Sequence, residues 1–306
     1  MHYSAAIGIL LLALTPIHTV HACDVCGNSI SSQNLGLLPQ FSRHFVGVQY
    51  LHTTSHSSHP SLFEGKPNEE SNQMYQYTQL WGRFQISKRF QLFAFVPYVQ
   101  TSNTQLGQSL KNSGIGDAST TINYSFPLAD KTNKKRMLLA GVGLKMPTGK
   151  YHYGSNLQGN GLPNTQMGTG SWDILGNINY TQKWKKWGYN VDVSYALTRA
   201  NKWQYKFGNR LNTAALAFYW LEFKQLKIVP QCGLRTEYAL HDYDDYSKKW
   251  LNEQTGGVMT FATLGTQLFY KNFGAKATVS VPAYQQYAAG YVRSNSRFEG
   301  GIFILF

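Results

Sequence analysis

Twelve segments in which apolar and polar residues alternate follow one another from about residue 40 to the end of the chain. Successive side chains of a strand point to opposite faces, so each segment predicts a strand between an apolar and a polar medium. The segments are 12–17 residues long, whereas strands of soluble proteins average about 5–6 residues and a tilted strand crosses a bilayer in about 9–11. They lie near residues 42–55, 73–87, 89–102, 114–126, 135–149, 168–183, 187–200, 206–222, 226–242, 255–270, 273–284 and 293–306.

The connections between these segments alternate in length. Short turns are expected near residues 87–89, 184–187, 222–226 and 271–272. Longer polar intervals are expected at residues 55–72, 102–113, 150–167, 200–206, 242–255 and 285–292. Outer-membrane barrels show short periplasmic turns and long extracellular loops. We therefore predict an all-β fold over residues 41–306, a transmembrane antiparallel β-barrel of about twelve strands. A soluble secreted β-sandwich or propeller is the alternative, and it does not explain the alternation of loop lengths.

The chain ends in an alternating apolar pattern that closes on Phe306. This ending resembles the C-terminal assembly signal of bacterial outer-membrane proteins, which makes the barrel-assembly machinery an expected partner. An even number of strands also places both ends of the barrel on the periplasmic side.

The composition excludes other classes. Of the 306 residues, 42% are hydrophobic but only 14% are charged, against roughly 25% charged in an average soluble chain. Mean hydropathy is −0.33, and apart from residues 5–14 no apolar run approaches the ~18 residues of a membrane helix. These features argue against a helical membrane protein and against an ordinary soluble enzyme.

The first residues predict export. An apolar segment at residues 5–14 and a small-residue site ending at Ala22 indicate a signal peptide over residues 1–22. Cys23 would then be the first mature residue, with lipidation as one option for it. Residues 23–40 precede the first strand and form either a periplasmic segment or a plug. The expected location is the outer membrane of a Gram-negative bacterium, in contact with the lipid bilayer and lipopolysaccharide.

Charge distribution favours a membrane rim over a nucleic-acid partner. The formal net charge is +13, and most of the surplus lies in or beside the predicted periplasmic turns, as at Lys88, Arg89 and Lys185. Anionic lipid headgroups account for such a rim, so no nucleic acid is expected as a partner.

The parity opposite the lipid face supplies the predicted lumen-lining residues, six basic and five acidic. They are Arg83, Asp117, Lys145, Asp173, Asp192, Arg210, Arg235, Glu237, Lys276, Arg297 and Glu299. A strongly ion-selective pore would carry charge of one sign, whereas balanced charges can pair across a narrow lumen. Any one of these residues can either brace the barrel or line a solute path.

Cysteine and histidine provide the other chemistry. Cys23 and Cys26 form a Cys-x-x-Cys pair that fits a small disulfide, a soft-metal dithiolate or, at Cys23, a lipid anchor. His52, His56 and His59 gather where the first strand meets the first long loop, and imidazoles at this density can hold zinc or copper. A polar loop can also gather histidines without binding an ion. No other cofactor is expected.

No catalytic residues are predicted. His152 and His241 lie outside any recognisable signature with a neighbouring nucleophile. The acidic pair Asp244 and Asp245 stands near Lys248 and Lys249 in a polar interval, as solvated charges do.

Short motifs resemble a known family. Residues 141–151, with Pro147-Thr148-Gly149, followed by Gly168-Thr169-Gly170-Ser171-Trp172-Asp173, are similar to a hairpin of the MetA-pathway-of-phenol-degradation family. The start at Cys23-Asp24-Val25-Cys26-Gly27 resembles a subset of such barrels from Bacteroidota. The resemblance implies an outer-membrane barrel and suggests uptake of small, often aromatic or hydrophobic compounds.

The pattern and the resemblance together favour passive or facilitated passage of a small solute without catalysis. Copper or zinc handling through the cysteine pair and the histidines is a second hypothesis. A structural or adhesive barrel with a sealed lumen is the third.

Overall fold

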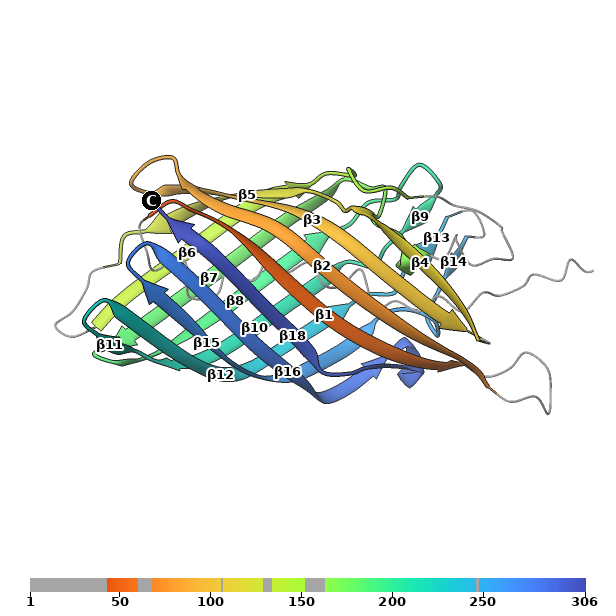
Figure 1. Cartoon of the computed structure of the whole chain (residues 1–306). Helices are drawn as coiled ribbons and strands as arrows, with labels where there is room; N and C mark the ends of the chain where they lie inside the picture. Colours follow the sequence, from red (N-terminus) through yellow and green to blue (C-terminus); the bar gives the residue numbers. More distant parts are fainter. Residues whose placement is uncertain (1–42, 60–67, 106, 129–133, 152–162, 246–247) are drawn as a thin grey trace, which may run out of the picture.

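The computed structural model describes residues 43–59, 68–105, 107–128, 134–151, 163–245 and 248–306. They form one closed antiparallel β-barrel, in which β1 pairs with β2 on one side and with β18 on the other (Figure 1). The expected twelve strands are confirmed, three of them as broken pairs of segments: β4 with β5, β10 with β11, and β17 with β18. Within the described residues no helix is long and apolar enough to span a membrane.

The first half of the ring runs from β1 to β8. Its strands are β1 Phe45–His59, β2 Glu69–Gln85, β3 Phe90–Gln105, β4 Gln108–Ile115, β5 Ser119–Phe126, β6 Lys134–Lys145, β7 Asp173–Trp184 and β8 Trp187–Leu197.

The second half runs from β10 back to β1. Its strands are β10 Arg210–Tyr219, β11 Leu221–Phe223, β12 Leu226–Ala239, β15 Gly257–Tyr270, β16 Phe273–Tyr287, β17 Val292–Ser294 and β18 Arg297–Leu305. A separate three-stranded sheet consists of β9 Tyr205–Lys206, β13 Tyr243–Asp244 and β14 Lys249–Trp250. Two short 3₁₀ helices, η2 Pro163–Thr165 and η3 Ala288–Gly290, complete the elements.

The two ends of the barrel differ. One end, here the turn end, carries the two-residue turns that begin at Lys185, Lys224 and Lys271 and the C-terminal Phe306 (Figure 1). These three lysines have positive φ, which both primed types of two-residue hairpin turn require at their first position. The other end, the loop end, carries β9, β13 and β14. Short turns mark the periplasmic side of outer-membrane barrels, so the loop end is extracellular.

Phe306 is exposed at the turn end. Its ring stacks on His44 with centroids 5.5 Å apart, and its N–H donates to the His44 carbonyl at 3.0 Å. The assembly role of this residue stays a prediction.

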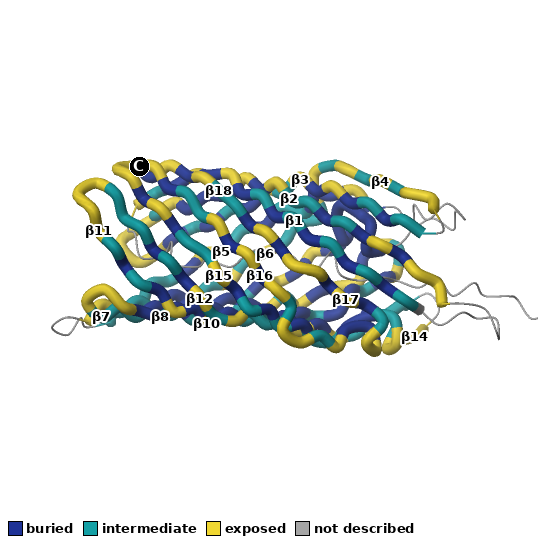
Figure 2. The backbone as a smooth tube through the Cα atoms, turned by 60° about the horizontal axis from the view of Figure 1, so that its bottom comes forward, coloured by how far each residue is buried: buried dark blue, intermediate teal, exposed yellow. Residues whose placement is uncertain are grey.

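Burial alternates along the strands, as the sequence pattern predicts (Figure 2). On β8, Asn190, Asp192 and Ser194 are buried, whereas Tyr195 and Leu197 are exposed. Apolar residues thus face outward and polar residues inward, which is the reverse of a soluble protein and is typical of a barrel in lipid.

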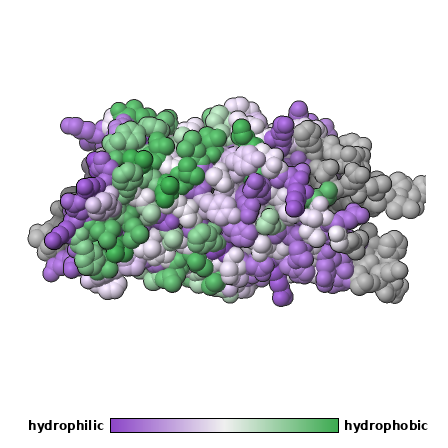
Figure 3. All heavy atoms as spheres, in the orientation of Figure 1, coloured by the Kyte–Doolittle hydropathy of each residue, from purple (hydrophilic) through white to green (hydrophobic). Residues whose placement is uncertain are grey.

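On the face shown in Figure 3, apolar residues form a belt across the turn-end half, and the loop-end half is hydrophilic. Exposed aromatic residues flank the belt, near the turns at Phe90 and Trp187 and further along the same strands at Tyr98 and Tyr195. Each pair spans nine residues counted inclusively, which matches the about 9–11 residues of a membrane-crossing strand. The chain is therefore an outer-membrane β-barrel that projects beyond the outer leaflet.

The prediction of long loops at residues 102–113 and 285–292 is wrong. Residues 102–113 form the hairpin of β3 and β4, and β16 continues to Tyr287 before the three-residue η3. The extracellular parts of these strands have polar residues on their outer face because they lie above the lipid, so alternation of hydrophobicity does not mark them.

A positive charge in the middle of the belt should be costly. Ile302 on β18 is 68% exposed, and an Arg on the lipid face of a barrel costs about 2–4 kcal/mol at the bilayer midplane. We expect Ile302→Arg to lower the free energy of unfolding in lipid vesicles by about this amount, measured by denaturant titration. Gln76→Arg, on the polar outer surface of β2, is the control and should cost ~0–1 kcal/mol. Equal losses for the two variants would contradict the location of the belt.

Candidate functional site

All eleven residues that the sequence suggested for the lumen are buried or half-buried in the structure. Seven are buried: Arg83, Asp173, Asp192, Arg210, Glu237, Arg297 and Glu299. The other four are half-buried: Asp117, Lys145, Arg235 and Lys276. Eight of them fall into two groups, one below the extracellular loops and one that crosses the barrel. Outside these groups, Arg83 Nε donates to the Arg43 carbonyl at 3.0 Å, Asp192 Oδ2 accepts from Asn179 Nδ2 at 2.7 Å, and Arg210 begins β10.

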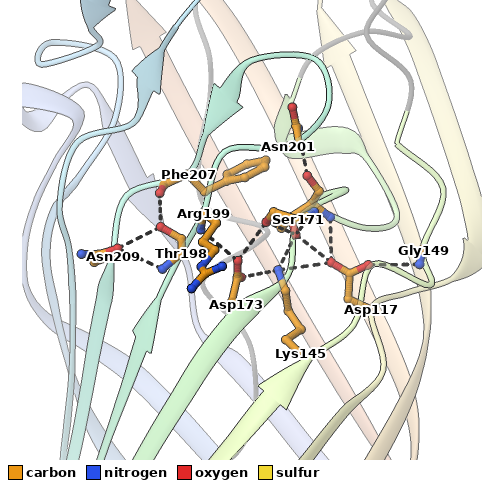
Figure 4. Close-up of polar contacts among 11 residues, drawn as sticks. Asp117, Lys145, Gly149, Ser171, Asp173, Thr198, Arg199, Asn201, Phe207 and Asn209 are labelled. Atoms are coloured by element: carbon orange, nitrogen blue, oxygen red, sulfur yellow. Dashed lines mark hydrogen bonds and ion pairs between the residues drawn. The ribbon is translucent and has the colours of Figure 1, made fainter.

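The first group is the Lys145 cluster, consisting of Asp117, Lys145, Thr169 and Asp173 (Figure 4). Lys145 ends β6, and its Nζ lies 2.5 Å from Asp173 Oδ2 and 3.3 Å from Asp117 Oδ2. It also donates to the Thr169 hydroxyl. Ser171 Oγ donates to Asp173 Oδ1 at 2.9 Å. One ammonium group thus pairs with two carboxylates, and hydrogen bonds stabilise the remaining negative charge.

The two motifs of the family resemblance meet at Asp117. Its Oδ1 accepts from the Gly149 N–H at 3.0 Å, and its Oδ2 accepts from the Thr169 N–H at 2.8 Å. A Cβ on Gly149 would lie 2.7 Å from Gly168 Cα, and one on Gly168 would lie 2.3 Å from Asp117 Oδ1. Only glycine permits this approach. The motifs therefore clamp together both ends of the loop between β6 and β7.

The segment 163–171 of that loop packs inside the barrel. Almost all of its residues are buried, and the Thr165 carbonyl accepts from Thr101 Oγ1 at 2.9 Å and from Asn112 Nδ2 at 3.2 Å. Asn201 Nδ2 donates to the Thr169 carbonyl at 2.9 Å from the next loop. Sequence analysis missed this inward loop and placed a plug candidate at residues 23–40, which lie outside the described residues. The sequence signal for the inward loop is the absence of Asp, Glu, Lys and Arg between residues 151 and 172.

The second group forms two ion pairs between β12 and β18. Arg235 Nη1 lies 2.5 Å from Glu299 Oε1, and Arg297 Nη1 lies 2.5 Å from Glu237 Oε1. Strands β15 and β16 separate these two strands in the ring, so the pairs span the inside of the barrel rather than one strand pair. Lys276 Nζ donates to Gln49 Oε1 at 2.5 Å on the same side.

The turn-end half of the interior has an aromatic side. The turn-end cluster consists of Phe45, Trp81, Phe93, Phe95, Phe218, Trp220, Val229, Phe269, Phe303 and Leu305. The rings of Phe45 and Trp81 have centroids 4.5 Å apart, and those of Phe269 and Phe303 are 5.7 Å apart. Strand alternation predicted that inward residues are polar, and this cluster is the main departure from it.

The wall from β5 to β8 carries amides at this end. Asn177 Nδ2 donates to Asn123 Oδ1 at 2.5 Å, and Asn190 Nδ2 donates to Asn179 Oδ1 at 3.1 Å. These four buried residues form the asparagine ladder. The interior near the periplasm is thus apolar and aromatic on one side and amide-lined on the other.

Asp242 is a buried acid that the sequence analysis did not single out. Its carboxylate accepts from Tyr205 O–H at 2.6 Å and from the Gly208 N–H at 2.7 Å. Burial raises the pKa of this carboxyl, and the nearby Arg210 guanidinium and the two hydrogen bonds oppose that rise. The contacts fix the loop above β10, directly beside the first residue of that strand.

The three histidines all lie on β1, which continues past its predicted end at residue 55. His52 and His56 belong to β1 itself and alternate with buried inward residues, so they are on its outer face. His56 Nδ1 is 3.0 Å from Asn72 Oδ1. His59 is the last residue of β1, and Cys23 and Cys26 lie outside the described residues. In the described part of the chain no three His, Cys, Asp or Glu residues are grouped so as to hold a metal ion. Metal binding stays a prediction.

The belt, the closed ring and the polar inner wall define a transmembrane barrel of the outer-membrane class. Comparisons with protein-family models and with curated proteins found no match. The structure is similar to that of the COG4313 outer membrane channel from Pseudomonas putida F1, with a TM-score of 0.62, 14% identity, and coverage of 86% of this chain and 96% of that one.

Two other solved barrels resemble it less. The NanC porin has a TM-score of 0.43 at 12% identity, covering 83% of this chain and 98% of that one. A Pseudomonas aeruginosa FadL homologue has a TM-score of 0.40 at 10% identity, covering 87% of this chain and 90% of that one. At these identities the likeness establishes the fold alone.

Proposed function

We propose that the barrel is a passive channel that passes a small, partly aromatic or hydrophobic solute across the outer membrane without catalysis. The observation that carries this proposal is the two-sided interior, in which the turn-end cluster faces the asparagine ladder. An aromatic wall offers a π surface to an apolar solute, and amides opposite can hydrogen-bond its polar group. The resemblance to the MetA-pathway family and the structural similarity to the COG4313 outer membrane channel support the same role.

The inward loop would set the width of this channel. Segment 163–171 occupies part of the extracellular mouth, and the β6–β7 loop that contains it is held at both ends by Asp117. A twelve-stranded barrel encloses more space than the side-chain-filled interior of eight strands and less than a porin of sixteen. We therefore expect a narrow conductance.

Thiol labelling of β8 tests the proposal. Asn190 points inward and Val191, the next residue, points outward. In a variant with Cys23, Cys26 and Cys232 changed to Ser, we expect Asn190→Cys to react with a charged, water-soluble methanethiosulfonate reagent, and its single-channel current in planar bilayers to fall. Val191→Cys is the matched control and should keep its current unchanged, since a charged reagent reacts poorly within the belt. Bilayers that never conduct, together with an unreactive Asn190→Cys, would instead support a sealed structural or adhesive barrel.

A further inference from the structure

Arg210 is a buried cation without an ion pair. It is 6% exposed, and its Nε and Nη2 atoms have no hydrogen-bond partner among the described residues. In the ring its cross-strand neighbours are Ala196 on β8 and Ala239 on β12, whose methyl side chains cannot accept a hydrogen bond. No ion pair of Arg210 occurs in the described part of the chain. The nearby Asp242 already accepts hydrogen bonds at both oxygens from Tyr205 and Gly208.

Arg297 presents the same free edge. Its Nη1 pairs with Glu237, while its Nε and Nη2 are buried and find no partner in the part of the chain that the structure describes. The guanidinium carbon lies 4.0 Å from the centroid of the Phe261 ring, which orients the planar group. In both arginines the unused donors are thus Nε and Nη2, two parallel N–H groups that match the two oxygens of a carboxylate.

Both arginines lie beside one buried apolar cluster. This cluster contains Phe261, whose ring lies under the Arg297 guanidinium, and Ala239, the cross-strand neighbour of Arg210. Tyr77 packs against the same cluster from β2, which lies across the ring from β10. The two guanidiniums therefore lie at the same level of the barrel interior.

We propose that Arg210 and Arg297 form a binding site for a small oxyanion, the carboxylate of an organic acid, on the path through the barrel. Buried donors without partners are rare in proteins, and an anion with two oxygens would satisfy them. The inference rests on the proposed channel and names its substrate class, a small solute with an anionic group and an apolar body. The body would lie against the aromatic cluster below.

The test measures anion preference in planar bilayers with a potassium acetate gradient. Arg210→Gln is the main variant, because Arg210 has no ion-pair partner that the change would leave unpaired. We expect its acetate-to-potassium permeability ratio to fall on the order of tenfold, the effect of losing charge-assisted hydrogen bonds. Arg210→Lys keeps the charge without the paired donors, so its permeability ratio should lie between those of the wild type and Arg210→Gln. The double change Arg297→Gln with Glu237→Gln removes the second guanidinium without leaving its carboxylate unpaired, and should also lower the ratio.

Arg293→Gln is the control, because Arg293 is four residues before Arg297 but exposed on the outer face of β17. It should keep the wild-type ratio. Equal ratios in all the variants would overturn the site while leaving the channel standing. Potassium phosphate in place of acetate distinguishes the source of the oxyanion, and a preference for phosphate alone would overturn the assignment to a carboxylate.

If the wild type conducts nothing, the channel proposal fails, and acetate binding to the detergent-solubilised barrel decides the inference separately. Saturable acetate binding that Arg210→Gln weakens about tenfold, with acetamide as the neutral control, would support the site. Equal binding by wild type and variant, or none by either, would overturn it.

Discussion

Replacing Lys145 with Met should destabilise the barrel by about 3–5 kcal/mol, because removal of one partner of a buried ion pair leaves charge without compensation. Lys145 is the single cation between Asp117 and Asp173, whose side chains are 6% and 4% exposed. Its loss also removes the hydrogen bond to Thr169 and frees the loop that enters the barrel. We therefore expect a second effect, a larger single-channel conductance. Denaturant titration in vesicles and planar-bilayer recording measure the two effects.

Lys150→Met is the matched control for this prediction. Lys150 belongs to the same loop and carries the same charge, but its side chain is exposed and makes no ion pair in the described residues. It should change stability by less than about 0.5 kcal/mol, as surface substitutions usually do. The triple variant Lys145→Met, Asp117→Asn, Asp173→Asn should regain part of the lost stability. A conductance that stays at the wild-type level in Lys145→Met would contradict the role of the loop as a constriction.

The barrel itself could be predicted because its determinants are local. Alternation along β8 depends on which side of one strand meets lipid, and that information is present in eleven consecutive residues. The strand count and the short turns at Lys185, Lys224 and Lys271 follow from the same pattern. Both faces are polar in the hairpin of β3 and β4 above the membrane, so hydrophobicity does not alternate there. For this reason the prediction of a loop was wrong.

The interior could be predicted only in part because it depends on contacts between distant strands. Parity alone assigns Arg235 and Glu299 to the inner face, but it does not indicate that they pair across β15 and β16. Similarly, Gly149 and Gly168 can be read as loop residues, whereas their requirement for glycine comes from Asp117, more than thirty residues away from Gly149 along the chain.

The aromatic cluster was missed for a related reason. Period-2 analysis assigns whichever parity is more apolar to the lipid, and strand ends with apolar residues on both parities give no answer. Residues 302–306 are all apolar. Phe303 is nevertheless 2% exposed and lies inside the barrel, whereas Ile304 is 50% exposed and lies outside. An apolar residue that interrupts the polar parity near the turns is the signal that would have indicated a filled, aromatic end of the lumen.

Glu299→Gln should be as destabilising as the loss of Lys145, by about 3–5 kcal/mol, because it leaves the Arg235 guanidinium buried without its carboxylate. Lys276 loses the same electrostatic partner. Denaturant titration of the variant in vesicles measures the loss. Glu70→Gln on the exposed part of β2 removes the same charge and should cost less than about 0.5 kcal/mol.

A double-mutant cycle with Arg235→Gln separates the pair from its surroundings. If the two residues stabilise the barrel by pairing across it, the double variant should be more stable than the sum of the single effects implies, with a coupling of about 0.5–3 kcal/mol. Neutralising both residues also removes a charged link between β12 and β18, so the double variant should show a changed conductance while Glu70→Gln does not. Additive single effects would mean that each charge is stabilised by other groups, and the link between β12 and β18 would then have no energetic basis.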